Sequence, residues 1–163
     1  MIKNSFILKS IFFGTILFLV CCDSSKNEKA WLNANKYYNN KDFNNCCVEL
    51  ISIVNNENAS VYIPKALFLL SEIYLNEYQE YYIAIDHLDQ IMNNYSNDEL
   101  AKRALFTKAY IYANYLDQYS DAIDLYSNFI SKYPNDELIS SVKYELTELD
   151  KYTLIIDQIL NSK

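Results

Sequence analysis

The chain has 163 residues, enough for one domain, and 51% of them are hydrophobic, so a packed core can form. Its single glycine is Gly14. Glycine-rich phosphate loops and tight hairpins are therefore excluded from the rest of the sequence, because both need backbone without a side chain. The formal net charge of −7 disfavours nucleic acid as a partner, since an acidic chain repels phosphate backbones.

The N-terminal segment has the order of a secretory signal. Lys3 and Lys9 precede an uninterrupted apolar stretch from Ile11 to Val20. A basic region followed by a short apolar region is typical of such signals. The apolar stretch is shorter than the roughly 20 residues that a bilayer-spanning helix needs. An ordinary signal peptide or an uncleaved anchor remains an alternative to the lipoprotein signal described next.

The end of this segment resembles the bacterial lipobox. Leu19-Val20-Cys21-Cys22 matches its pattern, with Cys21 at a position where Gly, Ala or Ser is usual. The resemblance implies cleavage after residue 21 and acylation of Cys22, and residues 22–27 then form a short polar tether. Two acyl chains on one cysteine give stable membrane attachment. We expect a lipid anchor on the periplasmic side of the cell envelope, with the outer membrane favoured over the inner.

An internal repeat of 38 residues follows. Residues 63–100 and 101–138 align without a gap and share 15 identities, including NDEL at the end of both copies. Such a period is typical of stacked supersecondary units. Ser96 and Glu99 form a capping-box pattern before the second copy. Apolar spacing predicts helices over 65–77, 81–94, 103–115 and 119–132.

Two further segments flank the clear repeats. Residues 28–62 read as a weaker copy, with Ala34 and Cys46 at the small-residue positions of its two helices. Residues 139–163 carry one apolar stripe that includes Val142 and Leu149, which predicts a helix that caps the open end of the array. We therefore divide the chain after residue 27 into 28–62, 63–100, 101–138 and 139–163.

These units resemble the tetratricopeptide repeat. Leu67, Ser71 and Tyr74 fill the first-helix pattern, and Ala84 and Leu88 fill the second. The second copy follows the same pattern, except that lysine replaces the expected leucine at position 108. The resemblance implies an all-α, right-handed α-solenoid of about three helix pairs plus a C-terminal capping helix. Small residues should mark the close helix contacts at Ala34, Ser71, Ala109, Cys46, Ala84 and Ala122.

In such a superhelix the first helices line the concave side, and aromatic residues dominate the positions expected there. Aromatic side chains are good anchors at protein interfaces. The residues proposed for partner binding are Trp31, Tyr38, Phe68, Phe106, Tyr110 and Tyr144. For Phe68 and Phe106, burial between repeats is an equally good interpretation. An acidic chain with an aromatic groove should prefer partners with basic and apolar residues.

The sequence shows no candidate catalytic or metal-binding set. The single histidine, His87, is expected on a helix surface, and Cys46 and Cys47 are expected to be buried thiols. No nucleophile, base and orienting group can be assigned together, so we expect no enzyme activity, no cofactor and no small-molecule substrate. Asn39, Asn76 and Asn114 end the first helices, and helix termination in the left-handed conformation is favoured there over ligand binding.

The anchor and the long repeat period resemble envelope lipoproteins of the β-barrel assembly machinery and the periplasmic coordinator of the Tol–Pal system. The β-barrel assembly lipoproteins usually carry five repeats, and this chain has three. The expected function is a membrane-anchored scaffold that binds protein or peptide partners at the envelope, in outer-membrane protein assembly. The alternatives are a coordinator of Tol–Pal and cell division, or a structural subunit that packs through its convex helices.

Overall fold

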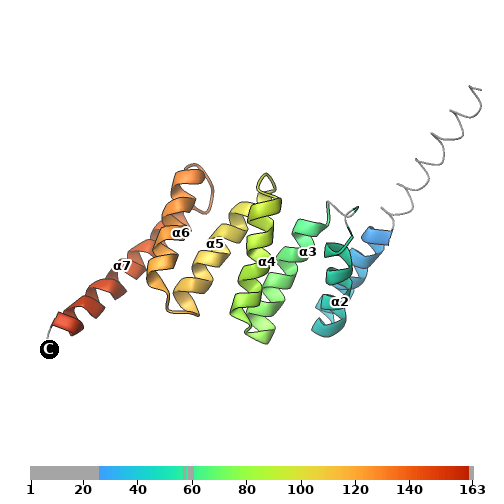
Figure 1. Ribbon diagram of the computed structural model, residues 1–163, viewed down its shortest axis with the longest axis horizontal. Coiled ribbons are helices and arrows are strands. Elements are labelled where there is room, and N and C mark those ends of the chain that lie inside the picture. The colour runs from blue at the N-terminus through green and yellow to red at the C-terminus, as the bar shows by residue number, and fades with distance from the viewer. Residues whose placement is uncertain (1–25, 57, 59–60, 162–163) are drawn as a thin grey trace, which may run out of the picture. The chain divides into compact units, whose positions relative to one another are not determined.

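The computed structural model describes residues 26–56, 58 and 61–161, and these residues form helices and turns without any strand. The predicted signal peptide and Cys22 lie outside the described residues. The chain divides into two compact units, Met1–Ala66 and Leu67–Lys163, with the division inside helix α3 (Ile63–Ile73). The helices follow one another as the repeat predicted (Figure 1), which confirms an all-α fold of solenoid-type helix pairs.

In the first unit, residues 26–39 are helical and α2 spans Phe43–Val54. Residues 26 and 27, which the sequence placed in the tether, therefore belong to a helix. The Oδ1 atom of Asn27 accepts a 2.7 Å hydrogen bond from Nδ2 of Asn56, which joins the two ends of the pair. The side chain of Asp42 caps α2 by accepting a hydrogen bond from the backbone N–H of Asn45.

In the second unit, α3 continues into a π-helical turn, η2 (Tyr74–Tyr78), which packs against α4 (Tyr81–Asn94). Next come α5 (Glu99–Asn114), α6 (Tyr119–Lys132) and the long α7 (Ile139–Asn161). Helix α5 packs against both α4 and α6, and α6 packs against α7. The core of this last group is built from buried residues of all three helices: Leu105, Ala109, Ala113, Ala122, Tyr126, Phe129, Val142 and Leu149.

The small residues that were predicted at helix contacts are all buried. Ala34, Cys46, Ala84, Ala109 and Ala122 have no exposed surface, and Ser71 has 1%. The Ser71 hydroxyl donates a 2.6 Å hydrogen bond to the carbonyl oxygen of Phe68, so its burial leaves no unsatisfied donor. Side chains of this size let helix backbones approach closely, which agrees with the proposed register.

The helix-terminating residues differ from those expected. The left-handed conformation occurs at Lys41, Gln79 and Asp117, with φ of 59°, 57° and 53°. These positions are 38 residues apart, so each repeat turns at the same place, three residues beyond Asn76 and Asn114. Asn114 remains in the last turn of α5, and its side-chain amide donates to the carbonyl of Tyr110. The prediction of left-handed asparagines was therefore wrong.

The repeated NDEL motif starts a helix through its aspartate. Oδ1 of Asp98 accepts a 2.9 Å hydrogen bond from the backbone N–H of Leu100, and Asp98 is the N-cap of α5. Asp136 repeats this contact with Leu138 at 2.9 Å. Ser96 lies two residues before the cap, so the predicted capping box does not form. None of the described helices is long and apolar enough to span a membrane.

His87 is half-buried rather than on the surface. Its ring lies 5.5 Å from the ring of Tyr74, measured between centroids, and its buried Nδ1 atom has no hydrogen-bond partner. Burial lowers the pKa of His87, and the nearby Asp86 carboxylate opposes that shift. The expectation of a surface histidine was therefore wrong, because the π-helical turn places Tyr74 against α4.

Candidate partner-binding site

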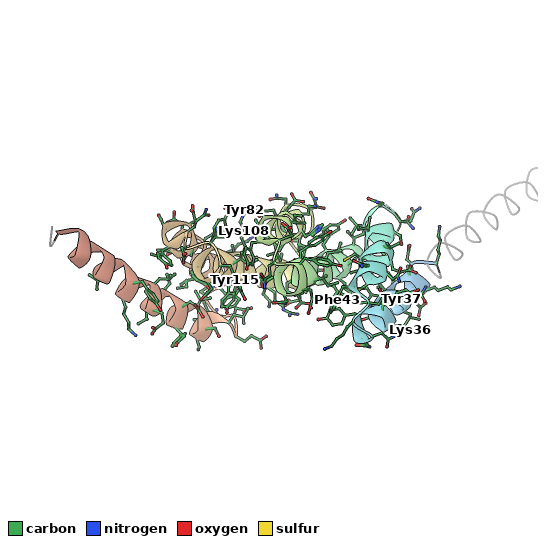
Figure 2. All side chains as sticks on the ribbon, turned by 90° about the horizontal axis from the view of Figure 1, so that it is seen from below. Lys36, Tyr37, Phe43, Tyr82, Lys108 and Tyr115 are labelled. Carbon is green, nitrogen blue, oxygen red and sulfur yellow. The ribbon has the colours of Figure 1, made fainter. Side chains whose placement is uncertain are left out.

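In the first unit, the two predicted partner-binding aromatics lie on the helix of residues 26–39. Trp31 is partly buried, with its ring centroid 6.3 Å from that of Tyr62. Tyr38 is exposed and meets Phe43 edge-on at 5.8 Å. Phe43 begins α2 and is labelled in Figure 2. Both predicted residues are thus held by a neighbouring ring, and both keep some accessible surface.

In the second unit, Phe68 belongs to the core. Its side chain is 7% exposed, and the guanidinium carbon of Arg103 lies 4.6 Å from the centre of its ring. Burial raises the pKa of Glu72 on α3, and the positive charge of Arg103 offsets part of that rise. Phe68 is therefore covered by a charged side chain, and the core interpretation of this residue fits best.

Phe106 is partly buried against the core that α5, α6 and α7 form. Its ring centroid lies 5.7 Å from that of Tyr126 and 6.5 Å from that of Phe129, both on α6. Phe106 therefore joins α5 to α6 and offers a partner only part of one ring face.

Tyr110 and Tyr144 keep more accessible surface. Tyr110 is half-buried, and its ring centroid lies 6.0 Å from that of Tyr115, which is labelled in Figure 2. The Tyr115 centroid in turn lies 4.9 Å from that of Tyr81 on α4. Burial raises the pKa of Tyr110, and the Tyr115 and Glu145 side chains add to the shift. Tyr144 on α7 is 63% exposed. Of the residues predicted in this unit, Tyr144 is the most accessible to a partner.

Beside these tyrosines lies a pocket of about 220 Å³ between the end of α5, the following turn and α7. The residues that line it are Ala113, Asn114, Asp117, Tyr119, Glu145, Glu148, Leu149 and Tyr152. Tyr119 and Tyr152 stack nearly parallel, with ring centroids 6.1 Å apart and planes inclined by 12°. We refer to this site as the α5–α7 pocket. It combines an aromatic wall with three carboxylates.

Sequence reasoning missed most of the α5–α7 pocket. It named Asn114 only as a helix terminator, and it assigned no role to Glu145 or Glu148. A usable signal was present, because Glu145, Glu148 and Tyr152 recur at three- and four-residue spacing and share a face of α7. That spacing alone does not reveal which residues of α5 the face meets.

The carboxylates of the pocket differ in their partners. Oδ1 of Asp117 accepts a 3.0 Å hydrogen bond from the Tyr119 hydroxyl, and Glu148 forms a 2.6 Å ion pair with Lys151. Burial raises the pKa of Glu145, the amide of Asn114 lowers it, and the Glu148 charge raises it again. Glu145 is thus a half-buried carboxylate held by a neutral amide and close to a like charge.

Tyr126 lies behind Glu145 and is fully buried, and its hydroxyl has no hydrogen-bond partner. Burial raises its pKa strongly, and Glu145 and Tyr110 are the next causes. The hydroxyl therefore lies in the same neighbourhood as the Glu145 carboxylate. Buried polar groups are nearly always satisfied, so this unpartnered hydroxyl is an exception within the core.

The vicinal cysteines of the first unit have a structural role. Cys46 and Cys47 are both buried on α2, as the sequence predicted. Burial raises the pKa of Cys46 to about 11, and the Cys47 thiol adds to the shift. A thiol with that pKa stays protonated near neutral pH, so Cys46 packs as a small apolar side chain.

Comparison with known proteins supports the interpretation of the repeat. Residues 103–136 match the family model of the tetratricopeptide repeat, which covers α5 and α6. No curated protein matches the chain. Tetratricopeptide repeats generally serve as non-enzymatic scaffolds that bind proteins or peptides. The chain therefore contains a tetratricopeptide repeat at residues 103–136.

Proposed function

We propose that this protein is a membrane-anchored scaffold that binds a polypeptide partner on the face formed by the first helices of its repeats. Three observations support the proposal: the family match, the exposed Tyr144, and the α5–α7 pocket beside it. The observation that carries most weight is the pocket, because aromatic rings and carboxylates from separate segments of the chain line it together. Half-buried aromatic rings there supply contact area with little loss of side-chain entropy.

The proposed location is the periplasmic side of the bacterial cell envelope. The support comes from the order of basic residues, apolar stretch and Cys22 in the sequence, all outside the described residues. The resemblance to lipoproteins of the β-barrel assembly machinery favours a role in outer-membrane protein assembly. A partner would then be a polypeptide at the membrane surface to which the acyl chains hold the domain.

Site-specific photo-crosslinking tests the proposed function. A benzophenone amino acid replaces Tyr144 in the full-length chain, and cells are irradiated before the membranes are extracted. The matched control carries the same amino acid in place of Tyr82, which is 62% exposed on α4, a second helix. We expect a discrete crosslinked polypeptide from position 144 and none from position 82.

Two outcomes would contradict the proposal. Equal crosslinking at both positions would indicate nonspecific proximity. Crosslinking at position 82 alone would favour a structural subunit that packs through its second helices.

A further inference from the structure

The two units of the chain differ sharply in charge. Residues 67–163 contain seven basic and sixteen acidic residues, for a net charge of −9, whereas residues 1–66 contain seven basic and five acidic residues. The acidic character of the protein is therefore a property of the unit that holds the α5–α7 pocket. A surface with this charge attracts cationic partners and orients their approach.

Glu145 differs from its neighbour Glu148 in its ion pairing. Among the described residues, no lysine or arginine forms an ion pair with Glu145, whereas Glu148 is paired with Lys151. The Lys151 side chain is 60% exposed, so it lies toward solvent. A half-buried carboxylate next to a second carboxylate gains free energy when a cation enters, because the cation relieves both burial and repulsion.

The remaining walls of the pocket suit an organic cation. Tyr119 and Tyr152 present stacked rings, and the faces of aromatic rings attract cations. Behind these walls the Tyr126 hydroxyl is fully buried without a hydrogen-bond partner, and the Glu145 charge contributes to its raised pKa. The acids do not converge as metal ligands would: the described residues hold no group of three suited to a metal ion.

We propose that the α5–α7 pocket binds a basic side chain, lysine or arginine, of the partner polypeptide. The cationic head lies against Glu145, and the methylene stem lies along the Tyr119–Tyr152 pair. This inference rests on the proposed function and adds the chemistry of the partner. A volume of about 220 Å³ is sufficient for one such side chain. The partner segment thus has a basic residue at the pocket and also contacts Tyr144, which lies on α7 together with Glu145.

Peptide titration tests the proposal with the mature protein, purified from membranes in detergent. The probe is acetyl-Gly-Leu-Ala-Lys-Ala-Leu-Gly-amide, with versions that carry arginine, acetyl-lysine or norleucine in place of lysine. Binding is followed by NMR signals of the α7 residues. We expect the lysine and arginine peptides to bind about tenfold more tightly than the acetyl-lysine and norleucine versions, because a charge-assisted contact is lost.

A matched pair of variants separates the pocket from the general charge of the unit. Glu145→Gln keeps the shape of the side chain and the position of its contact with Asn114, and we expect it to abolish the preference for lysine. Asp124→Asn removes the same charge from an exposed position on α6, outside the pocket, and should keep that preference. Circular dichroism melts of both variants establish that each is folded.

Three results would overturn the inference. Equal weakening by Glu145→Gln and Asp124→Asn would show diffuse attraction to an acidic surface. Equal affinity for the lysine and acetyl-lysine peptides would show that the cation is not recognised. Crosslinking of a partner at position 144, together with no lysine preference in the titration, would leave the proposed function standing and remove the pocket from it.

Discussion

Lys108 on α5 and Asp89 on α4 form an ion pair in which Nζ lies 2.6 Å from one carboxylate oxygen and 2.9 Å from the other. The lysine occupies the repeat position where the family has leucine. Its side chain is 16% exposed, and Nζ also lies 5.9 Å from the centre of the Tyr112 ring. The long stem thus fills the place of the leucine while its charged end reaches an acid of the preceding helix.

Removal of this lysine charge should destabilise the second unit. Lys108→Met retains an unbranched apolar side chain but leaves Asp89 without its partner, and we expect the free energy of unfolding to fall by about 1 kcal/mol. Chemical denaturation measures the change. In the double variant with Asp89→Asn, part of the loss should be recovered, because no uncompensated carboxylate remains. If the losses of stability in the two single variants add up to the loss in the double variant, Lys108 and Asp89 are not coupled.

Enlargement of the small contact residues should also destabilise the fold. Ala84 and Ala122 have no exposed surface, so leucine at either position forces two helices apart. We expect Ala84→Leu and Ala122→Leu each to lower the free energy of unfolding by about 1–3 kcal/mol. Ser127→Leu on the exposed face of α6 is the control, and it should leave the denaturation midpoint almost unchanged. Unchanged midpoints for both alanine variants would contradict the repeat register.

The Cys46 thiol should make stability depend on pH in the alkaline range. Its pKa is about 11 in the folded protein, against 9.0 for an ordinary thiol. Below about pH 9 the thiol is protonated in both states and has no effect. Between pH 9 and 11 only the unfolded state loses the proton, so stability falls by at most about 1.4 kcal/mol per pH unit. Comparison of wild type with Cys46→Ala isolates this slope, since other groups titrate equally in both.

The N-terminal anchor can be tested independently of the fold. Metabolic labelling with a fatty acid should mark the wild-type protein and fail to mark Cys22→Ser, because the resemblance to the lipobox predicts acylation of that residue. Cys21→Ser serves as the control and should still be labelled. If label is lost in Cys21→Ser and retained in Cys22→Ser, the modified residue is Cys21. A wild-type protein that takes up no label would argue against a lipoprotein signal.

Much of the fold could be predicted because the same helical pattern occurs in both copies of the repeat. The predicted helices 81–94 and 119–132 coincide with α4 and α6, since apolar periodicity is regular in both copies and the turn residues recur at 38-residue spacing. The π-helical turn at Tyr74–Tyr78 was not predictable, because it depends on how that segment packs against α4. Likewise, Lys41 and Gln79 belong to residue types with no preference for the left-handed conformation that the turn imposes on them, and only Asp117 is of a type that tolerates it.

The candidate site was predictable only in part. Spacing placed Tyr110 and Tyr144 on first helices, but it gave no estimate of how deeply each ring is buried. Phe68 was ambiguous for the same reason, and the structure places it in the core under Arg103. The α5–α7 pocket arises where α7 meets residues of α5 and the turn that follows it. That meeting depends on tertiary packing, which no local pattern in the sequence encodes.

The prediction that bears most directly on partner binding concerns Tyr110. This ring is half-buried, lies 6.0 Å from Tyr115, and its pKa responds to the charge of Glu145, a residue that lines the α5–α7 pocket. Tyr110→Ala should weaken binding of the polypeptide that crosslinks at position 144 by about thirtyfold, or about 2 kcal/mol, as expected for a central interface aromatic. Affinity measured by titration of the purified partner checks this value.

Two further variants decide how a loss at Tyr110 is to be understood. Tyr110→Phe keeps the ring and should retain most of the affinity, because ring contact rather than the hydroxyl is expected to anchor the partner. Tyr82→Ala removes an aromatic ring that is 62% exposed on α4 and should not change the affinity. Since Tyr110 also packs against Tyr115, the denaturation midpoint of Tyr110→Ala must be measured, and binding is compared below the onset of unfolding. If Tyr82→Ala abolishes binding and Tyr110→Ala does not, the partner docks on the second helices and the first-helix face is not its site.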